Sequence, residues 1–123
     1  MATKRTIPDN YANTQYEDLD VTNGSASVST ADGTSGTLYA VYLDNTAGSG
    51  DAHFRVFDSA GAQNGSTDPD HIFYAPGNTA RMYSIPAGLA YSTGLQYAAS
   101  PTGGTAGTTA LQSTLVARLL FQT

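Results

Sequence analysis

Short runs of alternating residues follow one another along most of this chain, and turn residues separate them. The runs are rich in β-branched and aromatic residues, which favour strands over helices. They lie at residues 25–30, 38–43, 53–57, 71–75, 81–85, 95–98 and 114–121. The dividers carry turn residues, as in Pro76-Gly77-Asn78 and Pro86-Ala87-Gly88. The pattern predicts an all-β antiparallel sandwich, jelly-roll-like, although an immunoglobulin-like strand order fits the same spacings.

Several predicted strands are apolar on both faces. Strict alternation over residues 38–43 places Leu38, Ala40 and Tyr42 on one side and Tyr39, Val41 and Leu43 on the other. A sheet with one solvated face shows a clean polar side instead. We therefore expect the second face to be covered, either by the chain itself or by another copy.

The last run is ambiguous between a strand and a helix. Leu111, Leu115 and Leu119 are four residues apart, as on a helix, whereas residues 115–121 also alternate as in a strand. The neighbouring stretch rich in Gly and Thr and the all-β context favour the strand.

The first twenty residues show no useful period, and Pro8 interrupts any helix. We interpret residues 1–20 as an extended N-terminal arm and residues 21–123 as the sandwich domain. The apolar and aromatic residues of the arm, namely Ile7, Pro8, Tyr11 and Tyr16, favour docking on a partner. A frayed terminus is the alternative.

Length and charge narrow the range of functions. The 123 residues fit one domain, and 10 acids against 5 Lys and Arg give a net charge of −5. Because the few cations are scattered, we expect no binding to nucleic acid or to an anionic membrane surface. No cysteine is present, and neither a signal-peptide core nor a long apolar run is apparent. Synthesis in a cytoplasm follows as the expectation.

The residues offer little for catalysis. The only histidines are His53 and His71, cysteine is absent, and no Gly-x-Ser-x-Gly motif occurs. The acids of Asp68-Pro69-Asp70 and of residues 17–20 match no calcium loop and fit turn chemistry instead. The glycine-rich residues 103–107 lack the lysine of a phosphate loop. We expect neither enzymatic activity nor a metal ion or cofactor.

Eight tyrosines remain to be explained. Tyrosine is enriched at interfaces because its ring is apolar and its tip is polar. Some of the eight must fill the core. We expect contacts between subunits at Tyr39, Tyr83, Tyr91 and Tyr97.

The polar arm, the stretch Leu38-Tyr39-Ala40-Val41-Tyr42-Leu43-Asp44-Asn45-Thr46 and the stretch Arg81-Met82-Tyr83-Ser84-Ile85-Pro86-Ala87-Gly88-Leu89 resemble small virion proteins of tailed bacteriophages. The spacer at residues 101–109, which is rich in Gly and Thr, resembles the same proteins. Within that group the chain looks most like the capsid decoration, or cement, proteins. The resemblance implies a homotrimer on the capsid surface of the virion, with the major capsid protein as its partner. It also implies that the arm grips capsid subunits.

Three functions are compared on this basis. The first is a structural protein that binds the capsid as an oligomer and stabilises it. The second is a receptor- or carbohydrate-binding module of a tail fibre or baseplate, suggested by loop Asp and Asn residues beside tyrosines. An enzyme acting on polysaccharide is the weakest of the three.

Overall fold

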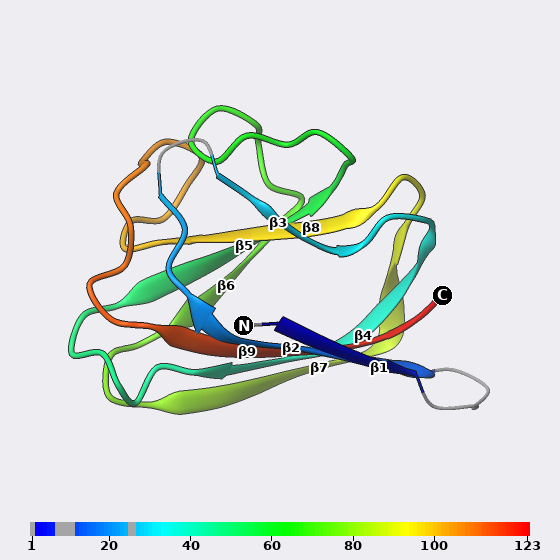
Figure 1. Ribbon diagram of the computed structural model, residues 1–123, viewed down its shortest axis with the longest axis horizontal. Coiled ribbons are helices and arrows are strands. Elements are labelled where there is room, and N and C mark those ends of the chain that lie inside the picture. The colour runs from blue at the N-terminus through cyan, green and yellow to red at the C-terminus, as the bar shows by residue number, and fades with distance from the viewer. Residues whose placement is uncertain (1, 7–11, 25–26) are drawn as a thin grey trace.

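In a computed structural model, which describes residues 2–6, 12–24 and 27–123, two antiparallel sheets pack face to face (Figure 1). The described residues contain no helix, which confirms the all-β sandwich. The five-stranded sheet has the order β1 (Ala2–Thr6), β2 (Thr14–Val21), β9 (Leu115–Gln122), β4 (Gly36–Asp44) and β7 (Ala80–Tyr91). The four-stranded sheet has the order β3 (Ser29–Asp32), β8 (Leu95–Ser100), β5 (Ala52–Asp58) and β6 (His71–Ala75).

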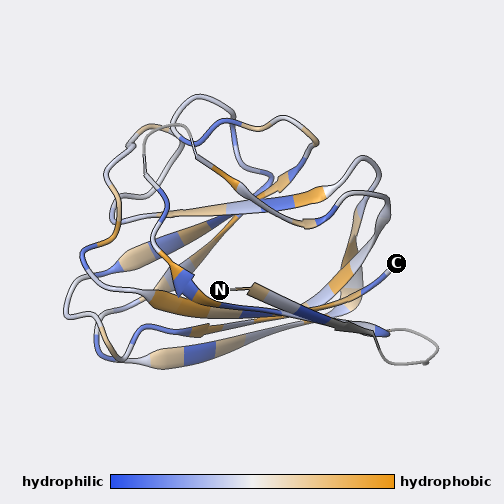
Figure 2. Cartoon of the chain, in the orientation of Figure 1, coloured by the Kyte–Doolittle hydropathy of each residue, from blue (hydrophilic) through white to orange (hydrophobic). Residues whose placement is uncertain are grey.

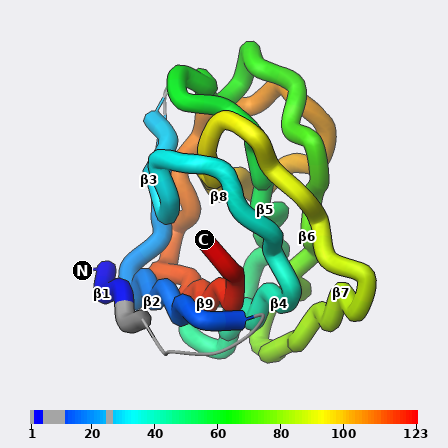
Figure 3. The backbone as a smooth tube through the Cα atoms, turned by 90° about the vertical axis from the view of Figure 1, so that its right-hand side faces the viewer, coloured from blue at the N-terminus to red at the C-terminus, as the bar shows by residue number. Residues whose placement is uncertain are grey.

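Strands that are symmetric about the middle of the chain pair with each other. The antiparallel pairs are β2 with β9, β3 with β8, β4 with β7, and β5 with β6. The C-terminal strand β9 consequently lies inside the larger sheet, between β2 and β4, as Figure 3 shows from the side.

The core lies between the two sheets. It contains large side chains from both layers, among them Phe54 and Tyr97 from the smaller sheet and Leu43, Leu119 and Phe121 from the larger one. Strand β9 shows how the sequence builds this layer, because its residues are alternately buried and partly exposed. The alternation decides the ambiguous last run in favour of a strand. Figure 2 shows apolar residues along the strands of both layers.

A bulge between β4 and β7 changes one of the predictions. Leu38 pairs with Leu89, whereas Ala40 pairs with Ser84, so β7 carries additional residues opposite Tyr39. The extra length absorbs Pro86-Ala87-Gly88, which the pattern predicted as a divider between strands. Proline is tolerated there because β7 is an edge strand and no ladder hydrogen bond is lost.

A second irregularity, between β4 and β9, shifts the faces of β4, because Leu38 pairs with Phe121 and Ala40 with the adjacent Leu120, so β4 carries one extra residue. Leu38, Val41 and Leu43 face the core, whereas Ala40 and Tyr42 line a hollow on the opposite side. The prediction that Leu38 shares a face with Ala40 and Tyr42 is therefore wrong, because strict alternation does not survive an inserted residue.

The N-terminal boundary also differs from the prediction. Residues 14–20 belong to β2, which pairs with β1 on one side and β9 on the other, and are not part of an arm. The inward positions of β2 include the polar residues Thr14 and Asp18, so the strand has no apolar period to detect. Ile7, Pro8 and Tyr11 lie outside the described residues.

Candidate binding face

The side of the five-stranded sheet that points away from the core carries two open hollows. We call it the outer face. Alternation along the strands brings together side chains from four of them: Gln15 and Glu17 of β2, Val116, Arg118 and Leu120 of β9, Ala40 and Tyr42 of β4, and Met82 and Ser84 of β7. Cross-strand neighbours such as Ala40 with Leu120 and Tyr42 with Met82 make the surface continuous.

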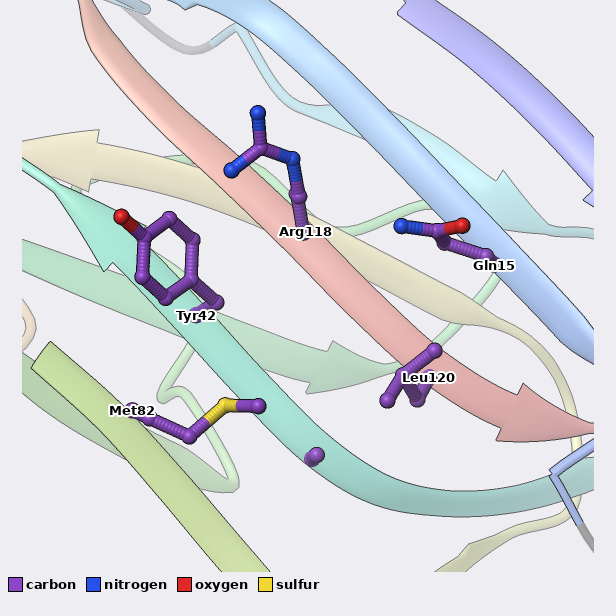
Figure 4. A pocket seen from close by; sticks show the side chains of 6 residues that line it. Gln15, Tyr42, Met82, Arg118 and Leu120 are labelled. Atoms are coloured by element: carbon purple, nitrogen blue, oxygen red, sulfur yellow. The ribbon is translucent and has the colours of Figure 1, made fainter.

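Two open hollows join on this face. One, of about 250 Å³, is lined by Gln15, Ala40, Tyr42, Met82, Arg118 and Leu120 (Figure 4). The other, of about 520 Å³, is lined by Ala12, Tyr39, Ala40, Met82, Ser84, Ile85, Pro86 and Leu120. The hollows share Ala40, Met82 and Leu120, and together they form one groove. Met82 is 57% exposed, the most exposed of the large apolar side chains in the described residues.

Arg118 is a cation that lines the smaller hollow, and Glu17 compensates its charge. Its Nε donates to Glu17 Oε2 at 2.5 Å, and its guanidinium lies 5.2 Å from the centre of the Tyr42 ring. The hydrogen bond to Glu17 raises the pKa of Arg118. Asp44, at the end of β4, has a lowered pKa because the hydroxyl and the amide of Thr46 donate to its carboxylate and because Arg118 attracts its charge.

The opposite sheet has no such open face at its centre, because the chain covers it. Phe57 and Ala98 pack there with Ala62 of the loop after β5. Arg55, fully buried on the same side, donates to Asn64 Oδ1 at 2.6 Å and to the carbonyls of Thr102, Ala106 and Gly107 at 2.6–3.2 Å. The apolar second face of β5 is thus covered by the chain itself, one of the two alternatives that the sequence left open.

Arg55 has no carboxylate among these partners, and its Nε and the Nδ2 of Asn64 lack hydrogen-bond partners. Burial lowers the pKa of the guanidinium. Within the glycine-rich residues 103–107, the carbonyls of Ala106 and Gly107 therefore accept hydrogen bonds from a buried cation. In the sequence Arg55 is one of several scattered cations, and its place inside a strand between the apolar residues Phe54 and Val56 was the available signal.

Of the four tyrosines expected between subunits, two are core residues. Tyr97 has no exposed surface and Tyr91 is 5% exposed, so their side chains are not available to a second copy. Tyr83 is half-buried, packs on Phe73, and donates to the carbonyl of Tyr74. Tyr39 is the member of the set that lines the groove.

Two buried hydrogen-bond networks explain where the tyrosine hydroxyls go. Tyr97 donates to Asp18, and the hydroxyls of Tyr16 and Tyr97 are 2.9 Å apart. Tyr16, expected to contact a capsid, is therefore a link between β2 and the opposite sheet. Polar residues at inward positions of β2 are tolerated because they are hydrogen-bonded.

The second network lies near the N-terminal strand. Tyr91 donates to Asp32 at 2.9 Å, and Lys4 of β1 approaches the other oxygen of Asp32 at 3.9 Å. Burial, strengthened by the neighbouring carboxylate, raises the pKa of Tyr91 well above its usual range.

The groups considered for chemistry are dispersed. His53 stacks at a tilt on Tyr74, with ring centres 5.3 Å apart, whereas His71 lines a small cleft beside Asp58 and Asp70. Asp70 accepts a hydrogen bond from the backbone of Asp58, and Asp68 accepts one from Thr105. Within residues 2–6, 12–24 and 27–123, no group of three or more His, Cys, Asp or Glu is placed to hold a metal ion. That part of the chain also contains no helix able to cross a bilayer.

Comparison with known proteins adds no identification. No protein-family model matches the sequence, and a search of curated proteins finds no significant match. The function is therefore argued from the geometry of the chain.

Proposed function

We propose that this chain is a viral structural protein of the capsid decoration type. It binds the outside of a protein shell as a homo-oligomer, with the major capsid protein as its partner, and it stabilises that shell. The observation that carries the proposal is the outer face, where an open apolar groove around Met82 is lined by residues of β2, β9, β4 and β7 and offers another protein chain a surface to bind.

The strand order supports the same proposal. We interpret the nested pairing of β2–β9, β3–β8, β4–β7 and β5–β6 as a jelly roll with β1 added at one edge. Viral capsid proteins and lectins use this architecture. Because one fold hosts many functions, the surface carries the argument and the topology only agrees with it.

The mechanism is additive. Each copy buries apolar area worth about 25 cal/mol per Å² against its neighbours. Many copies on one symmetric shell then convert a modest contact into a large avidity. In this proposal the capsid contact of the N-terminal segment falls to residues 1–13, with Ile7, Pro8 and Tyr11, because Tyr16 is held in the core.

The test uses particles purified from cultures that carry this gene. Quantitative mass spectrometry is expected to find the chain at a fixed ratio to the shell protein, and imaging is expected to place it on the outer surface. Particles from a strain lacking the gene should assemble but release their contents at a lower temperature. Absence of the chain from the particles would contradict the proposal.

A second candidate function is favoured by one exposed aromatic cluster. Tyr74 is 39% exposed, the guanidinium of Arg81 lies 5.5 Å from its ring centre, and the carboxylate of Asp51 raises the pKa of its hydroxyl. Aromatic rings beside polar groups suit a receptor glycan of the kind bound by a tail fibre or baseplate module. Saturable binding to one glycan in an array, abolished by Tyr74→Ala, would favour this function over decoration.

A further inference from the structure

We propose that the groove of the outer face is covered by the same face of a second copy of this chain. The inference names one partner of the homo-oligomer proposed above and rests on that proposal for its biological setting. To the proposed homo-oligomer it adds the surface that is buried, the residue at the centre of that surface and the symmetry of the pair.

The first argument is shape, because this face carries both a protrusion and a hollow. Met82 projects from β7 with more than half of its side chain exposed. The small residues Ala40 and Ser84 are paired across β4 and β7, and Leu120 lines the same hollow. A flexible methionine side chain fills irregular apolar gaps well. Met82 of one copy therefore fits the hollow beside Ala40 of the other.

The second argument is charge. The chain carries a net charge of −5, which repels a second copy over most approaches. None of the described residues that line the wider hollow is charged. Arg118, which lines the adjoining hollow, is paired with Glu17 within the chain and needs no partner across an interface. An uncharged apolar surface suits a copy of itself, whereas a polyanion or a charged peptide finds no complementary group in the hollow.

The third argument is area. Five strands spaced about 4.8 Å apart, with about 3.3 Å per residue over eight residues, project an area on the order of 600 Å². A stable interface buries about 800 Å² of accessible surface on each partner. Because accessible area exceeds the flat projection, the outer face is large enough for such a contact.

The symmetry follows from these features. A protrusion and a hollow on the same face are mutually satisfied by a two-fold axis, which gives a closed pair. The two larger sheets would then stack about 10 Å apart, as sheets do within a sandwich. A pair differs from the three copies implied by the resemblance, so the mass in solution separates the two.

The test compares two substitutions by sedimentation velocity across a range of concentrations. Met82→Glu places a charge in the hollow, whereas Ile72→Glu places one on the opposite sheet, where Ile72 is 40% exposed on an edge strand. We expect the unmodified chain and Ile72→Glu to sediment at twice the 12.7 kDa chain mass. Met82→Glu is expected to weaken the pair by about 100-fold, because a charge is left buried without a partner. Circular dichroism checks that both variants fold.

A monomer at about 100 µM, a trimer, or a dimer that Met82→Glu leaves intact would each overturn the inference. The outcome is separable from that of the particle experiment. A chain that is monomeric in solution yet present on particles contradicts only the pair, whereas a dimer that is absent from particles contradicts only the decoration function.

Discussion

At the scale of single residues, Arg55 is the least expected feature of this protein. It is a guanidinium with no exposed surface, surrounded by neutral oxygens of Asn64 and of the loop after β8. Burying a charge without a counter-charge is costly unless its hydrogen bonds are satisfied. Four N–H groups of Arg55 are satisfied, and in return they hold two long loops against the sheet.

We predict that Asn64→Asp stabilises the protein. The new carboxylate supplies the missing counter-charge to Arg55 and removes the Nδ2 group that lacks a partner. The expected gain is about 1 kcal/mol at pH 7, because a charged hydrogen bond is stronger than a neutral one but desolvation offsets part of the gain. Arg55 should hold the pKa of Asp at this position below its unfolded value. The gain should therefore be present at neutral pH and disappear as pH falls through about 4.

Urea unfolding at pH 7 and pH 4 measures this effect. Arg55→Met is the comparison variant, because it removes the cation and leaves Asn64 unchanged. Removing the guanidinium leaves the oxygens of Asn64, Thr102, Ala106 and Gly107 without these donors and should cost roughly 3 kcal/mol. A lower stability of Asn64→Asp than of the unmodified chain at pH 7 would contradict the prediction. It would show that the neutral Asn64 is a better partner for Arg55 than a carboxylate.

At the scale of elements, β1 and β2 have different roles. Strand β1 pairs only with β2 and contributes no residue to the core cluster, whereas β2 contributes Tyr16 and Val21 and pairs on both sides. A segment is dispensable when few buried contacts and hydrogen bonds depend on it.

Two truncations should therefore behave differently. A chain that starts after Asn13 loses β1 and the pair between Lys4 and Asp32, and it should keep the cooperative unfolding of the sandwich. A chain that starts after Val21 also loses β2. Because Tyr16 and Asp18 are then missing, the buried Tyr97 loses both hydrogen-bond partners and becomes exposed, and the chain should fail to fold. Thermal unfolding followed by circular dichroism distinguishes them. Cooperative unfolding of the shorter chain would place β2 outside the folding unit.

The sequence predicted the strands whose inward positions are apolar and missed those whose inward positions are polar. β6 was predicted with its observed bounds, and β9 was predicted to within one or two residues, because turn residues and alternation delimit both. β2 was missed because Asp18 is buried against Tyr97, a partner 79 positions away that no local pattern reveals. The same limit applies to Arg55, whose partners come from two distant loops.

The candidate face could be predicted only in part. Arg118 and Leu120 are the alternate positions of β9, so a strand assignment was enough to place them on one side. Their meeting with Ala40 and Met82 depends on the strand order and on the bulge in β4, and neither can be obtained from spacing. The assignment of Tyr91 and Tyr97 to an interface failed because tyrosine serves cores and interfaces equally well when its hydroxyl finds a partner.

At the scale of the whole molecule, buried tyrosines couple stability to alkaline pH. Burial raises the pKa of Tyr16, Tyr91 and Tyr97, and carboxylates hydrogen-bonded to Tyr91 and Tyr97 raise theirs further. In the unfolded chain these groups lose their protons near pH 10. The folded state then binds more protons than the unfolded state, so stability must fall as pH rises.

We predict a constant free energy of unfolding from pH 7 to about 9 and a loss of about 1.4 kcal/mol per pH unit for each buried tyrosine above pH 10. Urea unfolding between pH 7 and 11.5 measures the slope. Tyr97→Phe should reduce the slope by the contribution of one buried tyrosine. Tyr74→Phe should reduce it less, because Tyr74 is exposed. Equal slopes for both variants would contradict the assignment.

The place of β9 in the larger sheet also sets the order in which this protein can be made. Among the described strands β9 comes last along the chain, yet β2 and β4 meet only through it. Until its residues have been made, the groove lacks Arg118 and Leu120, and the facing edges of β2 and β4 remain unpaired. The sheet that carries the proposed interface therefore cannot be complete until residues 115–122 have been made, which keeps a copy without them from joining an assembly.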